Sequence, residues 1–94
     1  MHGEYKMPGG KLVVADLDVR DGKLADVRIS GDFFLEPDST LALIDMVLDD
    51  QPADAGRDYH ATVIDNALAP DMRMYGTSPE AIATAVQRAL ETAA

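Results

Sequence analysis

Apolar and polar residues alternate along two neighbouring stretches in the first third of the chain. The first stretch sets four apolar residues on one face, Val13, Ala15, Leu17 and Val19. The second stretch, after Asp21-Gly22, sets three more on one face, Ala25, Val27 and Ile29. Alternation with a period of two predicts strands with one buried face, and the turn residues between them predict a β-hairpin.

The loop of this hairpin is expected to span Arg20, Asp21 and Gly22. A shorter Asp21-Gly22 turn would set Leu17 opposite Asp26, although paired residues must point to the same face of a sheet. The longer loop requires Gly22 in the left-handed conformation of a G1 bulge. It pairs Val19 with Lys23, Leu17 with Ala25, Ala15 with Val27 and Val13 with Ile29.

A short third strand is expected at residues 33–35, ended by Pro37, and a helix follows it. Asp38, Ser39 and Thr40 are favourable helix caps. The residues after them place Leu41, Ile44 and Leu48 on one helical stripe, with Val47 at its edge. Residues 49–56 are polar and without periodicity, which predicts a loop.

Two further helices are expected in the second half of the chain. Residues 58–68 offer Tyr59, Val63 and Ala67 as an apolar stripe, and Pro70 ends that segment. Residues 72–75 are expected to be an extended connector. The last helix has the clearest start, because Ser78 suits the cap, Pro79 the first position and Glu80 the first turn. Its apolar stripe is Ile82, Ala85, Val86 and Ala89, with Leu90 beside it.

Strands followed by helices are typical of an α+β domain. We expect a small antiparallel sheet, made of the hairpin plus the short third strand, packed by about three helices. The 94 residues are enough for one domain, residues 1–94. The chain has neither the apolar stretch of a signal peptide nor the roughly 20 apolar residues of a membrane-spanning helix, so a cytoplasmic location is expected.

The composition excludes several classes of function. The 8 Lys and Arg against 17 Asp and Glu give a net charge of −9, which argues against nucleic-acid binding. The absence of Cys excludes disulfides, thiolate chemistry and iron–sulfur clusters. Asp outnumbers Glu by 13 to 4, a pattern typical either of proteins from a high-salt cytoplasm or of an Asp-rich codon bias. Both explanations remain open.

The segment Pro8-Gly9-Gly10-Lys11 looks superficially like a phosphate-binding loop. A P-loop has the sequence G-x-x-x-x-G-K-[ST] and leads into a helix, whereas this lysine leads into a strand. Two of the three lysines, Lys6 and Lys11, nevertheless flank the glycines in an otherwise acidic chain, and Gly9-Gly10 would expose backbone N–H groups. The alternative is a plain turn that leads into the strand.

Other candidates for chemistry are weaker. His60 has no positioned partner in the sequence, so we expect it to lie on a helix surface and not to act in catalysis. His2, near the terminus, is a still weaker catalytic candidate. The pairs Asp16/Asp18 and Asp49/Asp50 lack the ligand spacing of an EF-hand and are expected to be solvated carboxylates. No catalytic residue and no metal site are therefore assigned to this chain.

Phe33 and Phe34 are adjacent, and neighbouring residues of a strand point to opposite faces. One interpretation leaves one ring exposed, which would suit a protein–protein contact. The other buries both rings, one of them under the connector at residues 72–75.

Four segments together resemble the small accessory domain of lipoate–protein ligases. They are residues 3–13 (Gly-Glu-Tyr-Lys-Met-Pro-Gly-Gly-Lys-Leu-Val), 21–23 (Asp-Gly-Lys), 27–34 (Val-Arg-Ile-Ser-Gly-Asp-Phe-Phe) and 76–80 (Gly-Thr-Ser-Pro-Glu). In this family the domain follows the catalytic domain or, in some archaea and bacteria, is encoded as a separate small subunit. Because the resemblance begins at Gly3, we expect a separate subunit.

The resemblance implies a two-step reaction. The ligase joins lipoate to ATP, giving lipoyl-AMP and pyrophosphate, and then transfers the lipoyl group to a lysine of a lipoyl domain or of a glycine-cleavage H protein. Lipoate and ATP, with Mg, belong to the large catalytic subunit, and the small subunit is needed chiefly for the adenylation step. The small domain is also similar in fold to iron–sulfur scaffold proteins, a function that the lack of Cys excludes.

On this resemblance, the expected partner is the large catalytic subunit, with no nucleic acid and no membrane. Residues expected at the interface or near the adenylate are Tyr5, Lys6, Gly9, Gly10, Lys11, Phe33 and Phe34. Two other functions remain open. The chain could be a stand-alone acidic binding module that uses the face of Asp16 and Asp18, or a small enzyme that uses His60 and a carboxylate.

Overall fold

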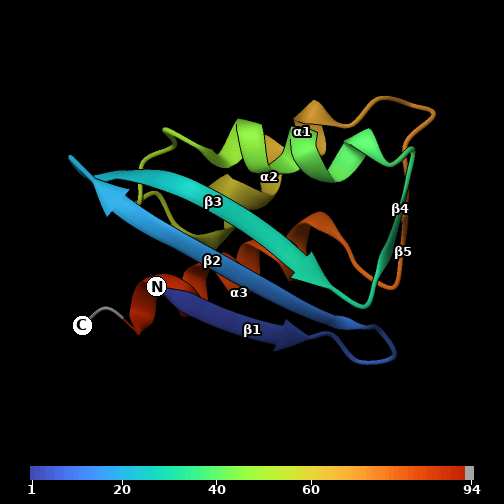
Figure 1. The fold of residues 1–94 in the computed structure, drawn as a ribbon, viewed down its shortest axis with the longest axis horizontal. Helices are drawn as coiled ribbons and strands as arrows, with labels where there is room; N and C mark the ends of the chain where they lie inside the picture. The colour runs from blue at the N-terminus through green and yellow to red at the C-terminus, as the bar shows by residue number, and fades with distance from the viewer. Residues whose placement is uncertain (93–94) are drawn as a thin grey trace.

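The computed structural model describes residues 1–92, which form five strands and three helices (Figure 1). The strands are β1 (His2–Lys6), β2 (Leu12–Arg20), β3 (Lys23–Gly31), β4 (Phe34–Glu36) and β5 (Arg73–Tyr75). The helices are α1 (Ser39–Leu48), α2 (Arg57–Ala67) and α3 (Pro79–Glu91). The α+β class expected from the sequence is confirmed.

The main sheet has three antiparallel strands in the order β1-β2-β3. Its third strand is β1, which the apolar pattern did not predict. The strand expected at residues 33–35 exists as β4, but it pairs with β5 in a separate two-stranded sheet rather than joining the hairpin. That part of the sequence prediction was wrong.

Close packing against α3 explains why β1 lacks an obvious apolar pattern. A Cβ atom at Gly3 would overlap the backbone of Ala85 and Ala89 in α3. Gly3 is therefore buried through the absence of a side chain, which hydrophobic alternation does not detect. Arg88 and Thr92 then donate to the carbonyls of Glu4 and His2, at 3.0 and 3.3 Å.

The hairpin turn has two residues and not three. Arg20 pairs with Lys23, and the turn residues Asp21 and Gly22 both have positive φ, 54° and 77°. A bulge further along the hairpin sets two residues of β3, Asp26 and Val27, opposite one residue of β2, with Asp26 at φ 51°. The extra residue lets Asp26 stay exposed while Val27 returns to the core. The bulge thereby avoids placing the apolar Leu17 opposite the carboxylate of Asp26, and no longer turn is needed.

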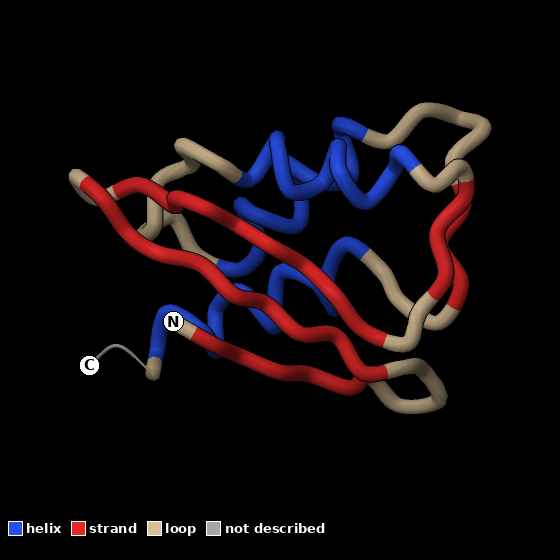
Figure 2. Tube along the Cα trace, viewed as in Figure 1, coloured by secondary structure: helices blue, strands red, loops and turns tan. Residues whose placement is uncertain are grey.

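The three helices lie on one side of the main sheet, with α3 behind β1 and β2 (Figures 1 and 2). Sheet residues in the core are Val13, Ala15, Leu17, Leu24, Val27 and Ile29. The helices contribute Ile44, Leu48, Ile64, Ala81, Ile82, Ala85, Val86 and Ala89. The opposite side of the sheet has no helix over it among the described residues.

The helix predictions succeeded at α3 and α1. The Ser78 hydroxyl accepts a hydrogen bond from the Ala81 amide at 3.0 Å, Pro79 opens α3, and the whole expected stripe is buried. In α1, Ile44 and Leu48 are buried as expected, although the Asp38 side chain makes no capping hydrogen bond. The connector at residues 72–75 is confirmed as extended, since it contains β5.

The prediction for α2 was wrong about its buried face. The residues that pack inward are His60, Ala61 and Ile64, whereas Tyr59 is 46% exposed. The buried face of α2 therefore begins one residue later than the expected stripe. The apolar pattern pointed to Tyr59 because histidine counts as a polar residue and tyrosine as an apolar one, yet His60 is the residue that is buried.

Two carboxylates near the C-terminal end of α1, Asp45 within the helix and Asp49 at its C-cap, close the free edge of β3. The Ile29 amide donates to Oδ1 of Asp45 and the Val27 amide to Oδ1 of Asp49, both at 3.0 Å. An exposed strand edge would otherwise offer these amides to another chain. No helix among residues 1–92 is long and apolar enough to span a membrane.

Candidate functional site

Three connections meet at one end of the molecule: the loop between β1 and β2, the link between β3 and β4, and the turn from β5 into α3 (Figure 1). The Lys11 amide donates to the Gly76 carbonyl at 2.8 Å, which ties the first connection to the third. The Asp32 amide donates to the Leu12 carbonyl at 3.3 Å, which ties the second to the first. Segments far apart in the sequence thus form one surface.

This end brings together most of the residues singled out from the sequence. Those in the three connections or next to them are Lys6, Gly9, Gly10, Lys11, Phe33 and Phe34. Tyr5 lies one position further back in β1. The sequence could not show that Gly76, more than sixty residues later, completes the surface.

The loop between β1 and β2 is a turn in which the amides of Gly10 and Lys11 form backbone hydrogen bonds. The Gly10 amide donates to the Met7 carbonyl at 2.9 Å, and the Lys11 amide is bonded to Gly76. The expectation that Gly9-Gly10 would expose its backbone N–H groups is therefore wrong for Gly10. The exposed side chains of Lys6 and Lys11 remain as the positive groups of this surface.

Gly76 lies directly under the stem of Lys11. Its φ is +81°, and a Cβ atom there would lie 2.6 Å from Cγ of Lys11. Only glycine meets both conditions without strain. The aliphatic part of Lys11 is thus held against the start of α3, while the charge stays in solvent.

Tyr5 is fixed to α3 and is half-buried at the edge of the core. The guanidinium carbon of Arg88 lies 4.9 Å from the centroid of its ring. The same arginine donates to the Glu4 carbonyl. This cation–π contact and hydrogen bond hold β1 on the helix, which gives Tyr5 a structural role in this chain.

Phe33 and Phe34 point to different surroundings. Phe33 packs against the core, whereas Phe34 is 55% exposed. The ring of Phe34 contacts Tyr75 on the neighbouring strand, with centroids 6.1 Å apart. The interpretation with one exposed ring is therefore confirmed, and the interpretation that buries both is wrong.

A shallow apolar hollow of about 270 Å³ opens beside Phe34. Its walls include Gly31, Phe33, Phe34, Leu35, Asp38 and Leu41. The name aromatic hollow is used for this feature below.

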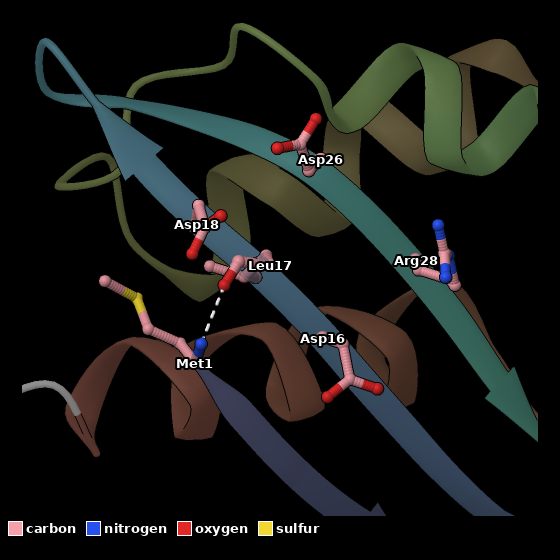
Figure 3. Close-up of a pocket in the computed structure, with 6 residues that line it drawn as sticks. All are labelled: Met1, Asp16, Leu17, Asp18, Asp26 and Arg28. Carbon is pink, nitrogen blue, oxygen red and sulfur yellow. Dashed lines mark hydrogen bonds between the residues drawn. The ribbon is translucent and has the colours of Figure 1, made fainter.

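A second hollow, of about 320 Å³, lies on the side of the sheet away from the helices (Figure 3). Figure 3 shows Asp16, Asp18 and Asp26 around it, with the amino group of Met1 bonded to the Leu17 carbonyl at 2.9 Å. Its carboxylates have partners on this chain. Asp16 binds Nδ1 of His2 at 2.7 Å, and Arg20 pairs with Asp26 and, at 3.8 Å, with Asp18.

His2 joins two carboxylates on that side. Its Nε2 lies 2.8 Å from Oε2 of Glu4, and its Nδ1 contacts Oδ1 of Asp16. The hydrogen bonds to Glu4 and Asp16 raise the pKa of His2 above its usual value of 6.5. Internal pairing of this kind leaves less negative charge on this face for a basic partner.

His60 is completely buried, not on the helix surface as the sequence suggested. Its Nε2 lies 2.8 Å from the Pro52 carbonyl, which fixes this nitrogen as the donor. Its Nδ1 has no hydrogen-bond partner among the described residues. A ring closed off from solvent and substrate cannot serve as a general base, so His60 anchors the loop at residues 50–56 to α2.

No group of three or more His, Asp or Glu side chains within residues 1–92 is arranged to hold a metal ion. The described surface at the end of the molecule offers two lysines, an exposed aromatic pair and an apolar hollow. Such groups can bind an anion and contact an apolar partner.

Comparisons with known proteins give one informative likeness. No protein-family model and no curated protein matches the chain. Among solved structures, a chain from a study of an archaeal lipoylation system, a bipartite lipoate protein ligase and its E2 lipoyl domain from Thermoplasma acidophilum, is similar with a TM-score of 0.75 and 21% identity. The similarity covers 92% of each chain, so the two folds correspond along almost their whole length. The chain therefore has a lipoate-ligase-related fold.

Proposed function

We propose that this chain is the small subunit of a two-component lipoate–protein ligase, required by a large catalytic subunit for forming lipoyl-AMP. The observation that carries the proposal is the similarity over 92% of both chains to a protein from a bipartite ligase system. Two of the sequence segments that resemble the accessory domain also lie together in space, because residues 3–13 and 76–80 meet through the bond from Lys11 to Gly76.

The chemistry of the described residues suits an accessory role. The one buried histidine faces a carbonyl, and the three carboxylates that line the polar hollow on the sheet are paired with His2 or Arg20. Lipoate, ATP and Mg would bind to the large subunit. This chain would contribute Lys6 and Lys11 near the anionic nucleotide, where positive charge favours the phosphates.

A comparison of the two half-reactions tests the proposal. Lipoylation of an acceptor domain is measured with the large subunit, with and without this chain, starting either from lipoate and ATP or from preformed lipoyl-AMP. We expect the chain to be needed for the first starting point and dispensable for the second. An equal requirement in both would contradict a role in adenylation.

Lysine variants sharpen this experiment. Lys6→Ala with Lys11→Ala should slow the reaction from lipoate and ATP at least tenfold and leave transfer from lipoyl-AMP within twofold. Lys23→Ala is the matched control, since Lys23 is also exposed but lies at the hairpin turn, at the opposite end of the molecule (Figure 1). A loss as large for Lys23→Ala would show that only overall charge matters.

A further inference from the structure

The aromatic hollow has the composition of a protein-binding surface. Phe34 and Tyr75 face each other across the two strands β4 and β5, and they are 55% and 50% exposed. Exposed aromatic pairs beside an apolar depression are typical of the central part of an interface, where aromatic side chains supply much of the binding energy. Neither ring is needed to fill the core.

Three carboxylates without ion-pair partners among the described residues lie in the lining of the hollow or next to lining residues in the chain. Asp38 lines it, Asp32 lies between Gly31 and Phe33, and Glu36 follows Leu35. Asp32, Glu36 and Asp38 are exposed, and none of them forms an ion pair within residues 1–92. Arg73 lies opposite Glu36 in the strand pairing, yet its guanidinium donates to the carbonyls of Pro70 and Met72, at 2.6 and 3.1 Å. This differs from the outer face of the sheet, where the carboxylates are paired with His2 or Arg20.

The size of the hollow favours a side chain over a metabolite. Its volume is about 270 Å³, and sites for small molecules are usually about 300–1,000 Å³ and more enclosed. An apolar side chain from a protein would fill it and cover the rings of Phe34 and Tyr75. Arginine or lysine residues on either side of that side chain would meet Asp32, Glu36 and Asp38.

We infer that the aromatic hollow is the docking site for the large subunit, and that it receives an apolar side chain flanked by Arg or Lys on that partner. This inference rests on the proposed function. It assigns two roles to one end of the molecule. The hollow binds the large subunit, and Lys6 and Lys11 lie near the phosphates of the nucleotide. Charge complementarity of this kind sets orientation and speeds association.

The test is the affinity of this chain for the large ligase subunit, measured by titration calorimetry at low and high salt. Phe34→Ala and Asp38→Lys should each weaken binding at least tenfold. Tyr59→Ala and Asp54→Lys are the matched controls, because Tyr59 is a 46% exposed aromatic residue on α2 and Asp54 an exposed carboxylate in another loop. Both should bind within twofold of the unchanged chain. Salt should weaken binding of the unchanged chain more than binding of Asp38→Lys.

A second measurement uses the unchanged chain and so does not depend on whether the variants fold. The amide NMR signals of the labelled chain should shift on addition of the large subunit mainly at residues around the hollow, including Phe34, Leu35, Leu41 and Tyr75. Unchanged melting temperatures would show that the variants are folded.

The outcomes separate the two proposals. Tight binding that Phe34→Ala and Asp38→Lys leave unchanged would overturn the docking site and leave the proposed function standing. Absence of any binding by the unchanged chain would overturn both. A dimer of this chain alone that dissociates in Phe34→Ala would assign the hollow to a second copy and also overturn the inference.

Discussion

The amide of Lys11 donates to the carbonyl of Gly76 at 2.8 Å, and the stem of the same lysine packs against this glycine so closely that a Cβ atom there would lie 2.6 Å from Cγ of Lys11. This contact joins the loop between β1 and β2 to the start of α3. It holds Lys11 at the end of the molecule where Phe34 and Tyr75 are exposed. This bond therefore helps to set the position of Lys11 relative to the aromatic pair, which the pairing of β4 with β5 holds in place.

The first prediction concerns this contact. Gly76→Ala should lower the free energy of unfolding more than Gly22→Ala. Both positions have positive φ, but only at Gly76 would the added Cβ atom clash with the side chain of Lys11. Left-handed backbone alone costs about 1–2 kcal/mol for a residue with a Cβ atom. Urea unfolding of both variants measures the difference. Equal losses would mean that the contact with Lys11 adds nothing.

The second prediction concerns the burial of β1. Gly3→Ala should destabilise the protein by about 3 kcal/mol or more, at or above the upper end of the usual cost of overpacking, since the added methyl group would overlap backbone atoms of Ala85 and Ala89. The measurement is again urea unfolding. Gly9→Ala is a useful comparison, because its Cβ would meet nothing within 4 Å and only its φ of +74° is unfavourable. A loss at Gly3 no larger than at Gly9 would contradict the close packing of β1 on α3.

The third prediction concerns the carboxylate that closes the edge of β3. Burial raises the pKa of Asp45 above its usual value of 3.8, against the opposing effect of the hydrogen bond from the Ile29 amide. Asp45→Ala leaves that amide without its acceptor and should cost about 1–3 kcal/mol. Asp45→Asn keeps an oxygen acceptor without the buried charge, so it should cost much less.

The pH dependence of these variants follows from the direction of the shift. A carboxyl with a raised pKa binds its proton more tightly in the folded state, so the cost of its charge is present at neutral pH and disappears as pH falls through the folded pKa toward 3.8. The stability of Asp45→Asn relative to the unchanged protein should therefore decline on acidification. A difference that stays constant from neutral to acidic pH would refute the burial effect.

The fourth prediction concerns His2. Because Glu4 and Asp16 raise its pKa above 6.5, the ion pairs of His2 should stabilise the fold at lower pH and lose that effect as pH rises through the raised pKa. Asp16→Asn should lower the pKa of His2, measured by the titration of its ring signals. Asp18→Asn is the control, since Asp18 lies near Arg20 and not His2. Equal shifts in both variants would show only a general effect of charge.

The sequence alone predicted the elements whose signals are local. The capped helix α3 and the two alternating strands β2 and β3 follow from residues that are neighbours in the chain. The register of the hairpin was missed, because a bulge at Asp26 and a longer turn both repair the mismatch with Leu17, and alternation does not distinguish them. The strand β1 was missed because Gly3 is buried by lacking a side chain.

In the candidate site, too, the sequence predicted features that depend on neighbouring residues and missed those that depend on distant contacts. The adjacency of Phe33 and Phe34 predicted that the rings point to opposite faces but left open whether one of them is exposed, and the structure exposes Phe34. The contact of Lys11 with Gly76 and the pairing of Phe34 with Tyr75 join distant segments, so no local pattern could show them. His60 was misplaced because its burial depends on the carbonyl of Pro52 in a loop without periodicity.

The central claim is that this chain enables adenylation by a separate large subunit. The most direct test is lipoate-dependent exchange between ATP and pyrophosphate, measured with the large subunit alone and with increasing amounts of this chain. We expect exchange to appear only when both are present and to reach its maximum near equal molar amounts. Full exchange by the large subunit alone would contradict the claim.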